Sequence, residues 1–273
     1  NTRESSKPFY LYYGLVGPHP PFDAPVQFRE FYEEIDSPEA VGPEERDVER
    51  WKAFAACITE VDYRIGQFLA ELDRLGLAQN TIILYTSDHG EMAGDHGRFG
   101  KGTFYEGSAR VPCFAAGPGI PENRSISAMA ELIDVGTTFV DIAGGKAHDR
   151  DQGISFLPAL TGQSDTHRED CFAEMGSDKM LFDGRFKLMY GDVTRDTRDI
   201  YKQAPFNGSG FGRPVNLIPD KISLFDLSVD PQELNNLADS PQHADVLQRM
   251  KNQLLDRMIQ NSLSNDGDPG SVL

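Results

Sequence analysis

The spacing of apolar residues predicts alternating strands and helices in the first part of the chain. Uninterrupted β-branched and aromatic runs at residues 8–16 and 81–86 are typical of strands buried on both faces, and residues 111–116 resemble them. Between the first two runs, residues 46–75 place an apolar side chain every three or four positions, which predicts a long helix ending at Gly76. This order of elements predicts a right-handed, parallel β-α-β unit.

The second half of the chain has a different pattern, which predicts antiparallel strands. Residues 131–143 still favour a helix. Two short apolar runs then flank the dipeptide Asp183-Gly184, which is a strong hairpin signal, and residues 223–227 form another strand-like run. Residues 243–259 favour a final helix with one apolar face.

These two patterns predict two structural parts. At 273 residues the chain can form one large α/β domain, or one domain with a smaller one beside it. We expect an α/β core over residues 1–164 and a smaller antiparallel sheet-plus-helix subdomain over residues 165–273. Residues 23–45 and 191–222 are loop-rich, and we expect them to shape the organic part of a substrate site.

The net charge of the chain limits the classes of partner that it can bind. There are 43 acidic and 26 basic residues, which give a net charge of −17. A surface this acidic repels phosphate backbones, so we expect no nucleic-acid partner, and an anionic substrate would need a local cationic pocket. No apolar stretch approaches the length of a membrane span. No signal peptide opens the sequence, its abrupt start is compatible with a processed or truncated chain, and the composition does not identify a compartment.

The three cysteines also give no sign of a metal site. Cys57, Cys113 and Cys171 lie far apart and lack the spacing of a metal-binding motif. We expect buried free thiols rather than a disulfide.

The candidate chemistry follows directly after the run at residues 81–86. Asp88 and His89 come where the strand ends, which is where ligands bind in parallel sheets. A carboxylate oxygen and an imidazole nitrogen are suitable ligands for a divalent cation, and the glycines that follow let the backbone fold back around the same point. The pattern therefore predicts a metal site at Asp88 and His89. For Asp-His-Gly alone, a solvated turn is an equal alternative.

Three further residues are candidates for contact with a substrate. Lys101 lies between two glycines and is placed to bind an anionic oxygen or to stabilise a developing alkoxide. His19 is fixed by prolines just past residues 8–16, where it would donate a proton to a leaving group, unless its role is structural. His96 either lines the same pocket or bonds a neighbouring loop.

The remaining ionisable residues have structural interpretations. Glu106 and Arg110, four residues apart, are better explained as a buried structural ion pair. His148, His167 and His243 lie in polar, turn-like or helical surface contexts, and we assign them no role.

The candidate residues lie within longer motifs that follow one another along nearly the whole chain. In order, these are Pro8-Phe9-Tyr10-Leu11, Pro18-His19-Pro20, Ser87-Asp88-His89-Gly90-Glu91, Gly94-Asp95-His96-Gly97 through Lys101, Tyr105-Glu106-Gly107-Ser108-Ala109-Arg110-Val111-Pro112, and residues 224–237. Together they resemble the sulfatase family within the alkaline phosphatase superfamily.

The resemblance implies an alkaline-phosphatase-like fold, with a mostly parallel sheet sandwiched by helices, and hydrolysis of a small sulfated substrate. It implies that Asp88 and His89 bind one divalent cation, that Lys101 contacts the sulfate and its bridging oxygen, and that His19 assists the leaving group. The resemblance favours calcium. Manganese is the alternative, because an imidazole suits it better.

One part of the family pattern is missing. Sulfatases carry a Cys-x-Pro-x-Arg or Ser-x-Pro-x-Arg element, whose first residue becomes the formylglycine nucleophile, and a paired-aspartate metal motif. Neither occurs in these 273 residues. The sequence therefore looks like the C-terminal portion of a sulfatase, with the formylglycine upstream. We expect the chain alone to be inactive, because it supplies no nucleophile and only half of the metal shell.

Two other functions stay open on the sequence alone. A phosphodiesterase or phosphonate monoester hydrolase of the same superfamily is one, because the Asp-His-Gly-Glu type of motif occurs there too. A non-catalytic, sulfatase-like binding module is the other. We also expect an unpaired parallel sheet edge to promote self-association.

Overall fold

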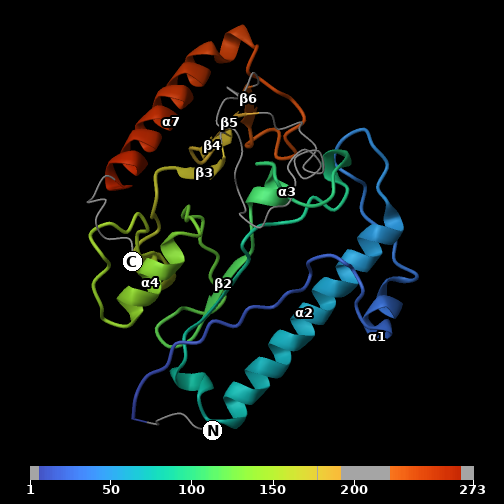
Figure 1. The fold of residues 1–273 in the computed structure, drawn as a ribbon, viewed down its shortest axis with the longest axis vertical. Coiled ribbons are helices and arrows are strands. Elements are labelled where there is room, and N and C mark those ends of the chain that lie inside the picture. Colours follow the sequence, from blue (N-terminus) through green and yellow to red (C-terminus); the bar gives the residue numbers. More distant parts are fainter. Residues whose placement is uncertain (1–5, 177, 192–221, 266–273) are drawn as a thin grey trace, which may run out of the picture. The chain divides into compact units, whose positions relative to one another are not determined.

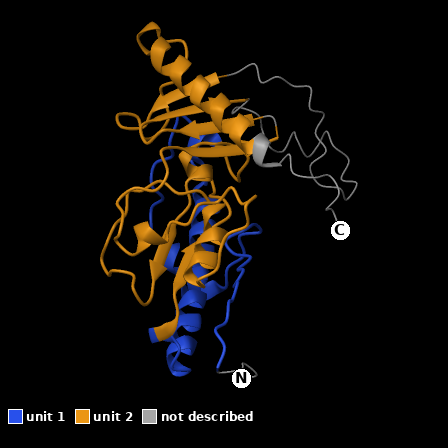
Figure 2. Ribbon diagram, turned by 90° about the vertical axis from the view of Figure 1, so that its left-hand side faces the viewer, with its two compact units in different colours: residues 1–79, 93–97 blue, residues 80–92, 98–273 orange. Residues whose placement is uncertain are grey.

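The computed structural model describes most of the chain, namely residues 6–176, 178–191 and 222–265. These residues form two compact units (Figure 2). Unit 1 consists of residues 1–79 and 93–97, and unit 2 contains the remainder. Unit 1 thus includes residues 93–97, which lie between the candidate residues His89 and Lys101 in the sequence. The boundary predicted after residue 164 falls inside unit 2 and stays a prediction.

Unit 1 is built around one long helix, α2 (Val48–Arg74; Figure 1). The side chain of Asp47 caps its first turn by accepting a hydrogen bond from the backbone N–H of Arg50 at 3.1 Å. The helix ends where Gly76 takes a left-handed φ of 67°, which glycine adopts without strain. The predicted helix over residues 46–75 and its glycine stop are confirmed.

Besides α2, this part of the chain contains short helical turns. They are α1 (Val26–Arg29), η1 (Glu30–Tyr32) and η3 (Asp95–Gly97), and η2 (Ala78–Asn80) follows the helix. The buried contact between α1 and α2 is apolar and consists of Ala24, Phe28, Ala56 and Cys57. Cys57 is a buried free thiol, as predicted.

The predicted strand over residues 8–16 is wrong. Neither of the two described sheets includes this segment, although a strand needs a ladder of backbone hydrogen bonds to a neighbour. Most of its apolar side chains are exposed, and Tyr13 stacks on Phe68 of α2 with ring centroids 5.3 Å apart. The parallel β-α-β unit is therefore absent from the described residues.

Unit 2 contains a two-stranded sheet of β1 (Ile83–Thr86) and β2 (Cys113–Ala116). The strands pair antiparallel, whereas the sequence pattern assigns no partner to residues 111–116. They run antiparallel because the connecting segment returns to the end of the pair that it left: the backbone N–H of Gly90 donates to the carbonyl of Ser108 at 2.8 Å. The expectation that Cys113 is buried is also wrong, because this free thiol is exposed on β2.

The C-terminal part of unit 2 is an antiparallel sheet covered by a helix. The sheet has the order β3 (Cys171–Met175), β4 (Asp178–Phe182), β5 (Phe186–Tyr190), β6 (Ile222–Asp226). After η4 (Pro241–His243), helix α7 (Ala244–Asn265) packs its apolar face on the sheet (Figure 1). The predicted hairpin, the last strand and the final helix are confirmed. Residues 192–221 of the loop-rich segment lie outside the described residues.

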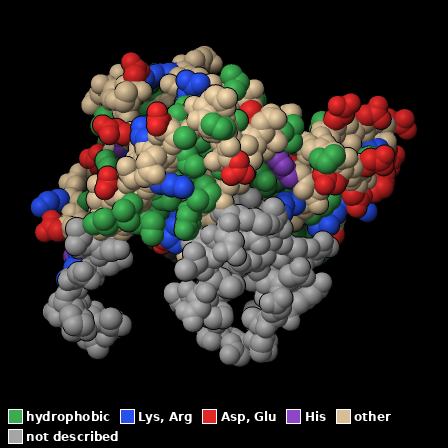
Figure 3. All heavy atoms as spheres, turned by 90° about the horizontal axis from the view of Figure 1, so that it is seen from above, with side chains coloured by type: hydrophobic (Ala, Val, Ile, Leu, Met, Phe, Trp, Pro, Cys, Tyr) green, Lys and Arg blue, Asp and Glu red, His purple; other side chains and the backbone are tan. Residues whose placement is uncertain are grey.

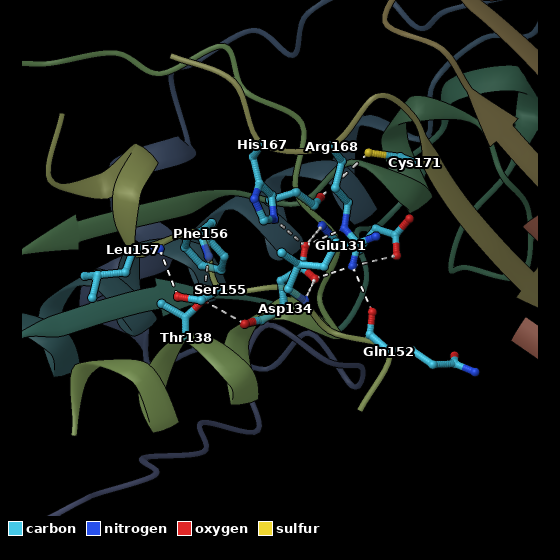
Figure 4. A network of polar contacts seen from close by, with 12 residues as sticks. Glu131, Asp134, Thr138, Gln152, Ser155, Phe156, Leu157, His167, Arg168 and Cys171 are labelled. Atoms are coloured by element: carbon cyan, nitrogen blue, oxygen red, sulfur yellow. Dashed lines mark hydrogen bonds and ion pairs between the residues drawn. The ribbon is translucent and has the colours of Figure 1, made fainter. Parts of the chain in front are cut away.

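Unit 2 also contains three short helices: α3 (Glu106–Ala109), in the connection from β1 to β2, and α4 (Asp134–Ile142) and α5 (Leu157–Leu160), which follow β2 along the chain. Predicted over residues 131–143, α4 is confirmed. Its first residue, Asp134, is fully buried in a polar network (Figure 4).

In this network Arg168 and His167 point toward the Asp134 carboxylate, with His167 Nε2 3.0 Å from Oδ2 (Figure 4). Burial alone would raise the pKa of Asp134, but hydrogen bonds, the strongest from Arg168, outweigh it and lower that pKa. His167 is thus buried, which corrects the surface position expected for it.

Acidic side chains are prominent on the described surface, as the composition leads one to expect. Asp and Glu side chains gather at one end of the face drawn in Figure 3. None of the described helices combines the length and the apolar character that crossing a membrane requires.

Candidate active site

The metal-ligand candidates lie directly after β1, as predicted. Ser87 leads from the strand into Asp88, whose carboxylate is exposed, and His89, which is partly buried. His89 Nε2 is 3.5 Å from Asp88 Oδ2, so the carboxylate and the imidazole face each other. The other carboxylate oxygen accepts the backbone N–H of His89 at 3.0 Å, which fixes the side chain over its own turn.

The second ring nitrogen of His89 determines its tautomer. Nδ1 lies 2.9 Å from the carbonyl oxygen of Gly90, and a carbonyl only accepts, so Nδ1 carries the proton in this contact. Nε2 then presents a lone pair toward Asp88, the arrangement usual for a metal-binding histidine. The two donors fit part of a calcium or manganese shell, and no group of three or more such ligands occurs within the described ranges.

Gly90 holds this ligand arm, residues 88–92, against α3. Besides the hydrogen bond to Ser108, the backbone itself packs closely here: a Cβ at Gly90 would lie 2.2 Å from the carbonyl oxygen of Gly107. Gly107 in turn packs on the buried side chain of Met92. Only glycine at position 90 permits this approach.

The same arm fixes the backbone that precedes Lys101. The backbone N–H of Met92 donates to the carbonyl of Gly100 at 3.0 Å, and the carboxylate of Glu91 accepts the N–H of Gly100. Lys101 is half-buried, and it forms no ion pair or hydrogen bond with the part of the chain that the structure describes. Within unit 2, the structure therefore pairs the residue before Lys101 with the end of the ligand arm that carries Asp88 and His89.

The expected Glu106–Arg110 pair forms, but it is not buried. Arg110 Nη1 is 3.5 Å from Glu106 Oε2, and the arginine side chain is 81% exposed. The close partner of Glu106 is instead Lys187 of β5, whose Nζ lies 2.6 Å from Glu106 Oε1. The sequence signal for this contact is a single lysine inside the apolar run of residues 186–190.

His19 belongs to unit 1. It is exposed in the proline-rich turn, where its Nδ1 lies 2.7 Å from the carbonyl oxygen of Pro20 and its backbone N–H donates to Val16 at 3.1 Å. The ring is thus oriented by its own turn, with Nδ1 as the donor. Its predicted catalytic role stays a prediction.

His96 also belongs to unit 1, in the turn of residues 93–97. Its backbone N–H donates to Val41 at 2.6 Å, so it does bond a neighbouring loop; a role in substrate binding stays a prediction. The buried Arg46 holds this turn, donating to the Ala93 carbonyl at 2.5 Å and to Asp95 Oδ1 at 2.6 Å. Arg46 is a residue that the sequence pattern did not single out.

The family profile described as Sulfatase matches residues 1–145, more than half of the chain. This chain belongs to the sulfatase family. The match covers the ligand arm, Lys101, His19 and His96, and it confirms the family that the motifs indicated.

Individual relatives agree with this assignment. An arylsulfatase of Clostridium perfringens is 30% identical over 93% of this chain and 54% of its own length. A solved structure described as a complex with its substrate D-glucosamine-2-N,6-O-disulfate has a TM-score of 0.63 and 25% identity, covering 81% of this sulfatase chain and 42% of that protein.

A phosphonate monoester hydrolase of Silicibacter pomeroyi gives a TM-score of 0.72 at 24% identity, over 89% of this chain and 54% of its own. The alkaline-phosphatase-like fold is therefore confirmed. The chain spans about half the length of the curated relatives it matches.

Proposed function

We propose that the protein to which these residues belong is a sulfuric ester hydrolase that acts on a small sulfate monoester. The observation that carries the proposal is the pairing of Gly100 with Glu91 and Met92, which holds Lys101 beside the metal-ligand arm. A cationic side chain with no described partner, on a segment paired with the arm that carries a carboxylate and an imidazole, suits an anionic ester. It also supplies local positive charge in a chain whose net charge is −17.

Each candidate residue would have its own role in the hydrolysis of the sulfate ester. Asp88 and His89 would hold the divalent cation, calcium or alternatively manganese, which when bound supplies electrostatic stabilisation to sulfate oxygens. Lys101 would bind the sulfate and its bridging oxygen, and His19 would protonate the departing oxygen. The attacking group would come from a formylglycine outside these 273 residues, since none of the three cysteines lies in the required context.

The metal part of the proposal is tested by calorimetric titration of this chain with calcium and with manganese. With only two described protein ligands we expect weak binding, on the order of millimolar. Asp88→Ala and His89→Ala should each abolish the heat signal, whereas Lys101→Ala should keep it because its ammonium is not a ligand. A micromolar site that survives both ligand substitutions would contradict the assignment.

The reaction is tested by assays of an aryl sulfate and a phosphonate monoester. This chain alone should hydrolyse neither, because sulfate esters resist water without an activated nucleophile. Sulfatase turnover that scales with the concentration of this chain and is lost in Asp88→Ala would show that a nucleophile had been overlooked. Preferential turnover of the phosphonate would favour the phosphonate monoester hydrolase instead.

A further inference from the structure

Lys187 is the largest fully buried side chain in the described structure, with 1% of its surface exposed. Its Nζ donates to Glu106 Oε1 at 2.6 Å and to Glu233 Oε1 at 2.8 Å. The second oxygen of Glu233 accepts the backbone N–H of Glu106 at 2.7 Å, which closes a ring of contacts. We call these three residues the Lys187 cluster.

Stability alone does not explain the Lys187 cluster. A buried ion pair can usually be replaced by apolar residues of similar size with little loss of stability, because desolvation of the charges offsets their attraction. Glu233 moreover adopts a left-handed φ of 58°, which costs free energy for a residue with a side chain. The cluster therefore holds a geometry that apolar packing would not specify.

The Lys187 cluster fixes the position of α3. Glu106 is the first residue of α3, and the cluster binds its side chain to Lys187 of β5 and its backbone N–H to Glu233, in the turn that follows β6. Just before the helix, Phe104 is buried in a core cluster with Met189 and Phe225 of the same sheet. The start of α3 is thus fixed from two sides.

Helix α3 in turn carries the ligand arm. The carbonyl of Ser108 accepts the N–H of Gly90, and Gly107 packs on Met92. Each step from Lys187 to Asp88 and His89 is therefore a hydrogen bond, an ion pair or a direct backbone contact within unit 2.

We propose that Lys187 is a positioning residue for the candidate active site, acting through α3 on the arm that carries Asp88 and His89. The inference rests on the proposed function for its catalytic consequence, but its structural part can be measured independently. The C-terminal sheet then forms a scaffold for the site.

The test is amide hydrogen exchange on this chain, with Lys187→Met compared with Arg168→Met. Both substitutions remove a buried cation from an ion pair, and the Arg168 side chain, 4% exposed, makes no hydrogen bond or ion pair with α3 in the described structure. Each network has its own reporter amide: Gly90 donates to Ser108, and Ile154 donates to Asp134.

In Lys187→Met, exchange at Gly90 and Glu106 should accelerate about tenfold or more while Ile154 stays unchanged. Arg168→Met should show the reverse pattern. Unchanged exchange at Gly90 in Lys187→Met, or equal acceleration in both variants, would overturn the inference. If Lys187→Met does not fold, Glu106→Ala, which leaves Lys187 paired with Glu233, should give the same local pattern.

Calcium and manganese titration separates this inference from the proposed function. Lys187→Met should weaken cation binding several-fold, while Arg168→Met leaves it as in the unmodified chain. If the unmodified chain binds neither ion, the metal assignment fails, and the exchange result still decides the role of Lys187. If Lys187→Met accelerates exchange at Gly90 but binds cations normally, its role as a positioning residue for the site is overturned.

Discussion

Lys101 and His19 differ in how strongly their roles depend on the substrate. Lys101 would stabilise charge in every transition state, a contribution on the order of 3 kcal/mol for a donor of this kind. In an active protein containing these residues, we predict that Lys101→Ala lowers kcat about 100-fold or more for both a nitrophenyl sulfate and an alkyl sulfate. Steady-state kinetics on the two substrates measures this.

His19→Ala should discriminate between the same substrates. A nitrophenolate leaves without a proton, so its turnover should change little, whereas the basic alkoxide of an alkyl sulfate should lose about 100-fold or more. Equal losses on both substrates would contradict the general-acid role. Lys101→Ala provides the comparison, because its losses should be similar on both.

The exposed Arg185 and buried Asp226 form a pH-dependent ion pair near the end of β6. Hydrogen bonds, first that of Arg185 Nη2 at 2.6 Å, lower the pKa of Asp226 from its ordinary 3.8 to about 2. Because folding lowers this carboxyl pKa, the ionised carboxylate stabilises the folded state. This stabilisation is complete above pH 3.8 and is lost as the pH falls toward about 2.

We therefore predict that Arg185→Met is destabilised relative to the unmodified chain near neutral pH, and that the difference shrinks as the pH falls from 3.8 to about 2. Thermal denaturation across this range measures it. Lys146→Met removes an exposed pair to Asp149 at 3.5 Å and should have almost no effect at any pH. A constant difference for Arg185→Met across the range would refute the linkage.

Among the elements, the contact between the ligand arm and α3 is the most sensitive to added volume. Gly90→Ala would place a methyl group 2.2 Å from a carbonyl oxygen, so we predict a loss of about 1–3 kcal/mol. Gly66→Ala, in α2, meets nothing within 4 Å and should raise stability by about 0.5–1 kcal/mol through helix propensity. Urea unfolding of both variants measures this, and a neutral Gly90→Ala would mean that the arm does not pack as described.

Elements whose signal is local were predictable from the sequence. Helix α2 has its apolar period, its Asp47 cap and Gly76 as its stop, and the hairpin has Asp183-Gly184 at its turn. The direction of β2 was not predictable, because it depends on where the connection from β1 returns. Residues 8–16 have the composition of a strand, but strand formation also requires a pairing neighbour that composition does not reveal.

The same distinction applies to the candidate site. Asp88, His89 and Lys101 occur in one contiguous motif, so the sequence identified them together. Lys187 and Glu233 lie 81 and 127 residues from Glu106, and such long-range contacts leave no periodic signal. Whether His19 and His96 act with the other candidates is still a prediction, because both belong to unit 1.

At the scale of the whole molecule, β2 presents apolar surface on a two-stranded sheet. Phe114 is 64% exposed there, and such an edge is a template for pairing with another chain. We predict concentration-dependent self-association that Phe114→Lys suppresses, measured by sedimentation velocity. Phe31→Lys is the matched control, because Phe31 is also 64% exposed but lies in η1 rather than in a sheet. A chain that stays monomeric at every concentration would contradict the prediction.

The path of the chain through its two units limits how this protein can be divided. Residues 93–97 belong to unit 1, although the residues before and after them, 80–92 and 98–273, belong to unit 2. A polypeptide cut after residue 79 would lack Ala93 and Asp95, and the buried guanidinium of Arg46 would lose two of its acceptors. Recombination at that point would therefore not yield interchangeable modules. The part up to residue 79 would have to be supplied with the five-residue turn, or be produced together with the part that contains it.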